Sequence, residues 1–297
     1  MSDHSEEDWA DEEWEFILNR VRDGECVPFL GAGASAGILP MGAIIAQKLA
    51  KKFHYPLPDS SDLIKVSQYV AVRSDRKYVK EEVLRILNES GQGKVELSRN
   101  PYKHLARLPL PLYVTTNYDS LMHDALKAQS PRRPRSNVCR WNSLMSNSSS
   151  SNGEEPTVAT PIVFHLHGSK EDVESLVLTE DDYVDFLTEM LRNPNLLPKT
   201  VESAIRKSTV LFIGYRLADW NFRILFQQLA NYNVSSIAVF PPPSTDDPSK
   251  DKIQDYLKKY YGALRIRIYW ATAEAFARCL VDRYAKKFGE RELVGRP

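Results

Sequence analysis

The sequence predicts an α/β fold, a Rossmann-like parallel sheet with helices on both faces and a smaller helical insertion. Short apolar segments of strand length alternate with segments of helical periodicity, as expected for parallel strands joined by helical crossovers. The continuous apolar segment Thr209–Ile213 is typical of a strand buried on both faces. The segment that begins at Val27 ends in a glycine-rich turn at Gly37, and a helical pattern follows from Met41. The length of 297 residues and the 42% hydrophobic content allow one or two domains with a substantial core.

The first predicted element is an acidic N-terminal helix within residues 1–24. Seven of the twelve residues from Ser2 to Glu13 are Asp or Glu, and the helix is expected to end near Asp23. An acidic first turn complements the helix dipole, which is the favoured interpretation. Docking of this acidic segment on a basic partner is the alternative. Residues 25–297 are expected to form one nucleotide-binding α/β domain.

The glycine-rich turn after the first strand is a candidate phosphate-binding loop. Gly31, Gly33 and Ala36 match the spacing G-x-G-x-x-G/A, in which small residues let backbone N–H groups approach a pyrophosphate. A plain turn between a strand and a helix explains the glycines equally well. Lys51 and Lys52 stand where a simple dinucleotide fold carries an acidic residue for the ribose, so a standard dehydrogenase is disfavoured.

Residues 41–108 are predicted to form a helical insertion beside the sheet. Apolar residues recur at helical spacing through this stretch, with breaks at residues 54–58 and 91–93. No part of it resembles a strand as strongly as the segments on either side. The α/β alternation resumes at Pro111–Thr116, a predicted strand that is followed by a helix over 120–127.

Residues 130–160 are polar and rich in Pro and Ser, which predicts a mobile loop. Arg132, Arg133 and Arg135 could bind phosphate groups, but a solvated loop is the favoured interpretation. Further strands are predicted over 161–166, 209–213, 236–240 and 264–270, and further helices over 181–191, 196–207, 219–232, 253–260 and 273–288.

Charge and cysteine content exclude several classes of protein. The 39 basic and 39 acidic residues balance, so no overall field draws the chain to a membrane surface, and direct binding of nucleic acid is not expected. Cys26, Cys139 and Cys279 form no C-x-x-C pair, which argues against a disulfide scaffold and against a four-cysteine zinc ribbon. No signal peptide and no apolar segment of about 18 residues is recognised, so we expect a cytoplasmic protein without a membrane span.

Four predicted strands end in small or polar clusters, and parallel strands place such clusters on one edge of the sheet. The clusters are residues 31–35 (G-A-G-A-S), 116–119 (T-N-Y-D), 167–169 (H-G-S) and 214–219 (G-Y-R-L-A-D). Each has a simpler explanation. Asn117 and Asp119 could cap a helix, although capping explains one more easily than both. His167 could be a core histidine, but Gly168 after it would permit close approach of a ligand. Tyr215 could pack on the strand end.

These four motifs, in this order, resemble the sirtuin catalytic domain, and most closely the sirtuin-like proteins of bacterial antiphage defence. The resemblance extends over roughly residues 26–240. It implies that the glycine loop binds the NAD pyrophosphate, that Asn117 and Asp119 face the nicotinamide ribose and carboxamide, and that His167 acts as general base or orients the ribose. Catalytic roles are thus expected for Asn117 and His167. Nucleotide contacts are expected from Ala32, Gly33, Ser35, Thr116, Asp119, Gly214, Tyr215 and Asp219.

The chain departs from protein-deacylating sirtuins because no paired-cysteine zinc module follows His167. The resemblance therefore implies an NAD glycohydrolase that uses NAD as substrate and no metal, forms nicotinamide and ADP-ribose, and depletes NAD during phage infection. It also implies a homo-oligomer and a HerA-type hexameric ATPase as possible partner. Trp9 and Trp14 could pack between subunits or cover the chain's own core. The alternatives are an NAD- or ADP-ribose-binding sensor without turnover, and a protein deacylase or ADP-ribosyltransferase.

Overall fold

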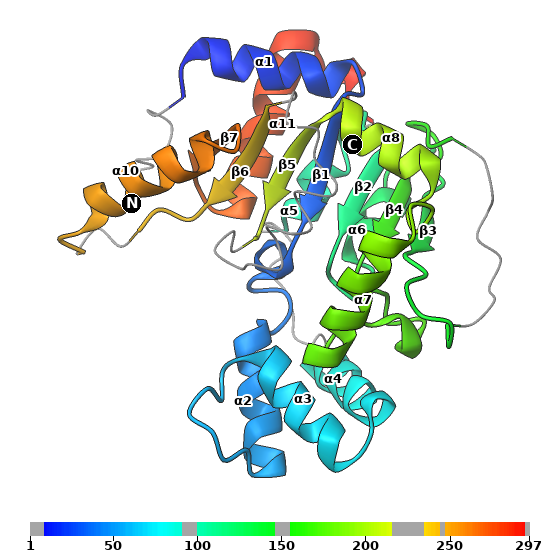
Figure 1. Cartoon of the computed structure of the whole chain (residues 1–297). Coiled ribbons are helices and arrows are strands. Elements are labelled where there is room, and N and C mark those ends of the chain that lie inside the picture. The colour runs from blue at the N-terminus through cyan, green and yellow to red at the C-terminus, as the bar shows by residue number, and fades with distance from the viewer. Residues whose placement is uncertain (1–8, 91–99, 146–154, 216–234, 244–246, 295–297) are drawn as a thin grey trace.

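The computed structural model describes residues 9–90, 100–145, 155–215, 235–243 and 247–294. Its centre is a seven-stranded sheet with the order β3-β4-β2-β1-β5-β6-β7, in which each pair of neighbours is parallel (Figure 1). The strands are β1 (Cys26–Leu30), β2 (Leu112–Thr115), β3 (Arg135–Val138), β4 (Ile162–His165), β5 (Thr209–Ile213), β6 (Ser236–Phe240) and β7 (Ile266–Trp270). The predicted parallel α/β fold is confirmed, and β3 is the strand that the sequence pattern did not reveal.

Helices cover both faces of this sheet, close to the predicted positions. They are α1 (Asp11–Arg22), α2 (Gly42–Phe53), α3 (Leu63–Arg73), α4 (Arg76–Ser90), α5 (Pro101–Leu105), α6 (Leu121–Lys127), α7 (Glu180–Arg192), α8 (Lys199–Lys207), α10 (Lys250–Gly262) and α11 (Ala273–Phe288), with 3-10 helices η1 (Ala32–Ser35), η3 (Val173–Ser175) and η4 (Glu290–Glu292). Helix α8 begins three residues later than predicted, directly after Pro198, its N-cap residue. The helix predicted over 219–232, with Asp219, lies outside the described residues.

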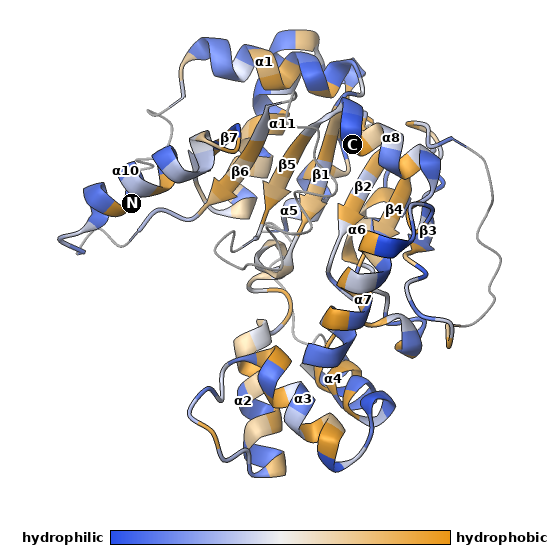
Figure 2. Cartoon of the chain, viewed as in Figure 1, coloured by the Kyte–Doolittle hydropathy of each residue, from blue (hydrophilic) through white to orange (hydrophobic). Residues whose placement is uncertain are grey.

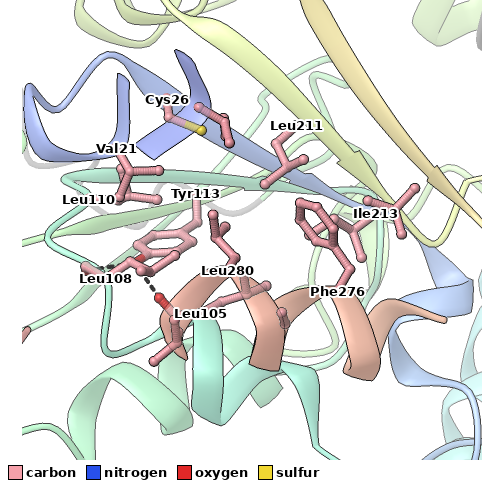
Figure 3. Packing of buried hydrophobic residues seen from close by; sticks show 14 of the residues in the cluster. Val21, Cys26, Leu105, Leu108, Leu110, Tyr113, Leu211, Ile213, Phe276 and Leu280 are labelled. Carbon is pink, nitrogen blue, oxygen red and sulfur yellow. Dashed lines mark hydrogen bonds between the residues drawn. The ribbon is translucent and has the colours of Figure 1, made fainter. Parts of the chain in front are cut away.

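Two apolar cores lie on opposite faces of the sheet, because successive strand residues point to opposite sides. In β5, Leu211 and Ile213 join α1, α5, α6 and α11 on one face, and part of this core is drawn in Figure 3. Val210 and Phe212 of the same strand join α7, α8 and α10 on the other face. The central strands β1 and β5 are accordingly apolar along their length (Figure 2).

The N-terminal helix is part of the first core. Trp9 and Trp14 are 8% and 2% exposed and pack edge-on against Tyr269 of β7. The indole N–H of Trp9 donates to the Ile268 carbonyl oxygen (3.2 Å), which covers part of the edge strand. Of the two roles considered for these tryptophans, the structure shows that they cover the chain's own core.

Helices α2, α3 and α4 build a third core beside the carboxyl edge of the sheet (Figure 1). In contrast α5, also within the predicted insertion 41–108, packs against α6 and α11 in the main body. A buried ion pair joins the three-helix unit to α7, since Lys80 Nζ lies 3.2 Å from Asp182 Oδ1 and both side chains are 1% exposed. Asp182 Oδ2 also accepts the Leu178 and Thr179 N–H groups at the start of α7.

The loop expected over residues 130–160 contains an ordered edge strand. Residues 135–138 pair with β4 as β3, and the pattern R-S-N-V hid this strand because it is partly exposed and mostly polar. Arg132 is neither solvated nor a phosphate ligand, since it is 4% exposed. Its guanidinium donates to the carbonyl oxygens of Ala106 (2.8 Å), Leu108 (2.8 Å) and Leu110 (3.3 Å).

Replacing Arg132 by methionine is expected to lower the free energy of unfolding by about 3 kcal/mol. The change removes the donor from the carbonyl oxygens of Ala106 and Leu110, whereas Leu108 keeps the Leu110 N–H (2.8 Å), and each unsatisfied buried group costs about 1–3 kcal/mol before relaxation. Urea unfolding of the variant measures this loss. The neighbouring Arg133 is exposed, so Arg133→Met is the control and should stay within about 0.5 kcal/mol of the wild type.

In the part of the chain that the structure describes, no helix combines the length and the apolar character needed to cross a bilayer.

Candidate functional site at the carboxyl edge of the sheet

The loops after β1, β2 and β5 meet at the point where the strand order reverses. β1 pairs with β2 on one side and with β5 on the other, so that β2, β3 and β4 lie on one side of it and β5, β6 and β7 on the other. Open α/β sheets bind ligands in the crevice at this position. The topology thus brings together the glycine-rich turn, the T-N-Y-D motif and Gly214, as the sequence predicted.

The glycines of the first loop are required by backbone packing. Gly33 N–H donates to the Gly214 carbonyl oxygen (2.9 Å), and a Cβ on Gly33 would lie 2.9 Å from Gly214 Cα. Gly214 has a φ of +77°, and a Cβ there would lie 2.1 Å from Ala34 N. The small residues therefore allow two loops to touch each other. The Gly33 N–H group is already bonded to protein, whereas Ala32 is exposed.

Asn117 lies at the centre of the site with a defined side-chain orientation. Its amide Nδ2 lies 3.0 Å from the Gly31 carbonyl oxygen, which can only accept, so the atom facing Gly31 must be the nitrogen. Nδ2 also lies 3.3 Å from Ser35 Oγ and 3.2 Å from the Tyr102 hydroxyl. Both amide hydrogens thus point into the protein. No donor among the described residues contacts Oδ1, which is left as an acceptor for a ligand.

Ser35 and Asp119 join the same hydrogen-bond network. Ser35 Oγ donates to Asp119 Oδ2 (3.3 Å), and Asp119 Oδ1 accepts the Leu121 N–H (2.9 Å) at the start of α6. Asp119 therefore caps the helix while Asn117 does not, so capping explains only one of the two. Burial raises the pKa of Asp119, because the charged carboxylate loses hydration.

His167 follows β4 as Asn117 follows β2, at the same edge of the sheet. Thr115 is aligned with His165, and Asn117 and His167 each follow two residues later. The His167 ring packs edge-on against Tyr183 and Phe186 of α7, with centroids at 5.4 and 5.1 Å. Its nitrogens have no hydrogen-bond partner among the described residues. Desolvation lowers the pKa of His167 to about 3, so the imidazole is neutral at physiological pH.

Gly168, which follows His167, allows the backbone of Ser175 to pack closely against it. It has a φ of +92°, and a Cβ on it would lie 2.3 Å from the Ser175 carbonyl oxygen. The expectation that this glycine makes room for a ligand is corrected, because the space beside its Cα is filled by the Ser175 backbone. Gly168 instead allows the chain to turn so that Val177 N–H reaches the His167 carbonyl oxygen (3.0 Å).

Thr116 and Tyr215 link the loops after β2 and β5. The Thr116 hydroxyl lies 2.6 Å from the Tyr215 hydroxyl, which also donates to the Leu30 carbonyl oxygen (3.3 Å). The Tyr215 ring packs on Phe29 with a centroid distance of 5.4 Å. Tyr215 therefore braces the ends of three strands, and its predicted contact with the adenosine half of a nucleotide stays a prediction. Asp219 lies outside the described residues.

Sequence reasoning missed two residues of this site, Tyr102 and His165. Tyr102 fits the helical apolar pattern of residues 41–108, and its hydroxyl gives no separate signal in the sequence. His165 is 2% exposed, and its Nδ1 lies 3.3 Å from the Asn117 carbonyl oxygen. Burial lowers the pKa of His165 to about 4. A neutral imidazole with Nδ1 protonated donates to that carbonyl and so supports the Asn117 backbone.

The depressed histidine pKa values predict a loss of stability in acid. A histidine that titrates near 6.5 when unfolded and near 4 when folded binds its proton more tightly in the unfolded chain. Its contribution is complete above about pH 6.5 and is lost as the pH falls toward 4. For His165 this amounts to about 2 kcal/mol between about pH 7.5 and pH 5.

Urea unfolding at both pH values measures this loss. His165→Asn, which keeps a donor at this position, should show a pH dependence smaller by that amount. Equal pH dependence in the two proteins would show that His165 does not titrate differently on folding.

The fold and the site together define a Rossmann-like α/β protein with a polar candidate site beside its first strand. Comparison with protein families narrows this class. The model of the SIR2-like domain matches residues 111–263, more than half of the chain, and the chain belongs to this family. The sirtuin-like character inferred from the four motifs is thereby confirmed.

Curated relatives share a single description. The chain is 27% identical over 210 residues to a protein of Enterococcus faecium named NAD(+) hydrolase ThsA, covering 69% of this chain and 40% of the relative. It is 25% identical over 214 residues to the Bacillus cereus protein of the same name, covering 72% and 41%. The chain thus spans about two fifths of the length of these relatives.

A solved structure from work on the "Structural Basis for the Mechanism and Regulation of Sir2 Enzymes" covers 93% of this chain and 98% of its own, with 12% identity and a TM-score of 0.43. Similarity at this level adds nothing to the family assignment.

Among the residues that the structure describes, no group of three or more His, Cys, Asp or Glu side chains is arranged to hold a metal ion.

Proposed function

We propose that the chain is an NAD glycohydrolase that cleaves NAD to nicotinamide and ADP-ribose. The observation that carries the proposal is the Asn117 amide, which directs both hydrogens into the protein and whose Oδ1 accepts no donor among the described residues, at the strand edge that also carries His167. The names of the partial-length relatives support the same activity. The substrate would lie across the carboxyl edge, near the loops after β1, β2 and β5.

The reaction breaks the C–N bond between nicotinamide and ribose. The bond electrons leave with nicotinamide, which becomes neutral, while positive charge develops on the ribose. A water oxygen then bonds to the anomeric carbon and releases one proton to solvent. Asn117 Oδ1 accepts a hydrogen bond from that water or from a ribose hydroxyl without changing its own charge. Orientation of the two reactants is the main contribution such an amide can make.

His167 fits the role of orienting group better than that of strong base. Its pKa of about 3 makes proton abstraction from a hydroxyl unfavourable in the unliganded protein. A neutral imidazole nitrogen can still accept a hydrogen bond from a ribose hydroxyl, and this bond strengthens as positive charge develops on the ribose. Protonation of the ring next to that charge would be unfavourable, so a neutral imidazole suits the site.

Isotope labelling tests whether water is the acceptor. The protein is incubated with NAD in water enriched in oxygen-18, and the products are examined by mass spectrometry. Hydrolysis predicts one labelled oxygen in ADP-ribose and one nicotinamide released per ADP-ribose formed. Nicotinamide release that requires an acyl-lysine peptide, or that leaves ADP-ribose attached to protein, would instead support a deacylase or a transferase.

The low basicity of His167 also supports a second candidate, an NAD- or ADP-ribose-binding sensor without turnover. Such a module would be stabilised against heat by NAD, yet would leave the NAD intact over many hours. Nicotinamide formation that is lost in His167→Ala excludes this candidate.

Cellular roles are proposed on the resemblance of the motifs. We infer a cytoplasmic effector that depletes NAD in antiphage defence, acts as a homo-oligomer and responds to a HerA-type ATPase. Light scattering measures the oligomeric state, and NAD consumption with and without the ATPase measures dependence on this partner. A monomer with equal activity in both samples would refute the oligomer and the partner.

A further inference from the structure

Tyr102 places a buried hydroxyl at the centre of the Asn117 network. Its side chain is 1% exposed, and its oxygen lies 2.6 Å from Ser35 Oγ and 3.2 Å from Asn117 Nδ2. The three residues come from α5, from the turn after β1 and from the loop after β2. One phenol therefore joins segments that are 67 and 15 residues away in the sequence.

Counting donors fixes the direction of each hydrogen bond. Ser35 has one hydroxyl hydrogen, and it is directed at Asp119 Oδ2, so the short bond between Tyr102 and Ser35 must use the tyrosine hydrogen. The phenolic oxygen then accepts from Asn117 Nδ2. The result is a directed chain from the Asn117 amide through Tyr102 and Ser35 to the Asp119 carboxylate. Every donor in this chain has an acceptor inside the protein.

Helix α5 holds Tyr102 rigidly. The Tyr102 N–H donates to Asn100 Oδ1 (2.9 Å), which caps the helix, and the helix packs against α6 and α11. Arg132 binds the carbonyl oxygen of Ala106 directly after α5. The phenol ring could fill the same space without its hydroxyl, so packing does not explain why a tyrosine occupies this position.

We propose that Tyr102 is a positioning residue, which fixes the Asn117 amide so that Oδ1 faces the substrate. The proposal rests on the proposed NAD glycohydrolase function, since it assigns the Oδ1 acceptor a role in that reaction. Tyr102 acts through Asn117 and Ser35 and does not itself contact the reacting atoms. Without the phenolic oxygen, one amide hydrogen keeps only the 3.3 Å contact with Ser35 Oγ, while the other keeps its bond to the Gly31 carbonyl oxygen. The amide is then held mainly at one point and can tilt, so its acceptor no longer stays aligned with the attacking water or the ribose hydroxyl.

Kinetics of Tyr102→Phe test the proposal in the full chain. The variant is expected to lower kcat for nicotinamide release roughly 10- to 100-fold, as misplacement of a catalytic group does, while KM for NAD changes by less than about twofold. The double variant Tyr102→Phe/Ser35→Ala should be no worse than the poorer single variant, because both act through one network.

Tyr113→Phe is the matched control. Tyr113 is also fully buried, and its hydroxyl donates to the Leu105 carbonyl oxygen (3.1 Å), as Figure 3 shows. Within the described part of the chain this hydroxyl makes no hydrogen bond to Asn117, Ser35 or Asp119. This variant should lose stability but keep the wild-type kcat and KM. A loss of kcat in Tyr102→Phe that merely followed stability would appear in Tyr113→Phe as well.

A second readout does not require turnover. In NMR spectra of nitrogen-15-labelled protein, the side-chain NH₂ signal of Asn117, assigned by its absence in Asn117→Asp, should shift and exchange faster with solvent in Tyr102→Phe and stay unchanged in Tyr113→Phe. If the wild type hydrolyses no NAD, the proposed function fails and this signal alone decides the positioning role. An unchanged Asn117 signal, or a wild-type kcat for Tyr102→Phe in an active enzyme, overturns the proposal.

Discussion

Asn117→Ala is expected to lower kcat for nicotinamide release roughly 1,000-fold, the range found when one oriented polar group is removed from a reaction centre. Alanine removes the Oδ1 acceptor, and the loops after β1 and β2 lose the bond to the Gly31 carbonyl oxygen. The measurement is nicotinamide formation at saturating NAD, with circular dichroism to confirm folding. Asn137→Ala on the edge strand β3 is the control and should retain wild-type activity.

Asn117→Asp sharpens this test. The isosteric carboxylate must direct either oxygen at the Gly31 carbonyl oxygen, where the amide nitrogen stood, and two acceptors in contact repel. The variant should therefore be as inactive as Asn117→Ala in spite of its shape. Retained activity in Asn117→Asp would show that the orientation of the amide is not what the site requires.

Lys80→Met is expected to lower the free energy of unfolding by about 3 kcal/mol, because the buried Asp182 carboxylate keeps only the more distant and half-exposed Arg76 guanidinium (3.6 Å) as a cationic partner. Lys80 and Asp182 are both 1% exposed, and Asp182 is held at the start of α7 by two backbone N–H groups. The carboxylate cannot move into solvent without breaking these bonds. Urea unfolding of the variant and the wild type measures the difference.

Lys52→Met provides the contrast. Lys52 pairs with Glu82 of the same three-helix unit at 2.6 Å, but its side chain is 42% exposed. Its loss should cost less than about 1 kcal/mol, as for other exposed ion pairs. Equal losses in Lys80→Met and Lys52→Met would show that burial does not set the cost. The Lys80–Asp182 pair also affects the candidate site, because it anchors α7, and α7 carries the two aromatic rings that pack against His167.

Most of the sheet could be predicted because its strands are buried on both faces. β5 is a continuous apolar segment, and a glycine or polar turn follows each of the strands at the site. β3 could not be predicted, since an exposed edge strand needs no apolar pattern, and R-S-N-V is indistinguishable from a loop. Arg132 was misjudged for a related reason, because nothing in the sequence indicates that three backbone carbonyls lie around one arginine.

The site was predictable as a set of motifs but not as a network. Strand-end position and parallel topology placed Asn117 and His167 on one edge. The contribution of Tyr102 depends on where α5 packs. Its hydroxyl contacts residues that are distant in the sequence, and its spacing is the one expected for the buried face of any helix. For Gly168 the motif suggested space for a ligand, but in the fold the Ser175 backbone fills the space beside its Cα. Motifs predict which residues lie together at one edge of the sheet. Tertiary packing determines which of their polar atoms are already bonded within the protein and which can bind a ligand.

Nicotinamide release from NAD by the purified wild-type chain and by His167→Ala, measured side by side, tests the central claim most directly. His104→Ala is the control, because His104 is another partly buried histidine whose pKa is lowered by burial. We expect equimolar nicotinamide and ADP-ribose from the wild type and from His104→Ala, and none above background from a folded His167→Ala. Undiminished release in His167→Ala, or intact NAD after prolonged incubation with the wild type, would contradict the account.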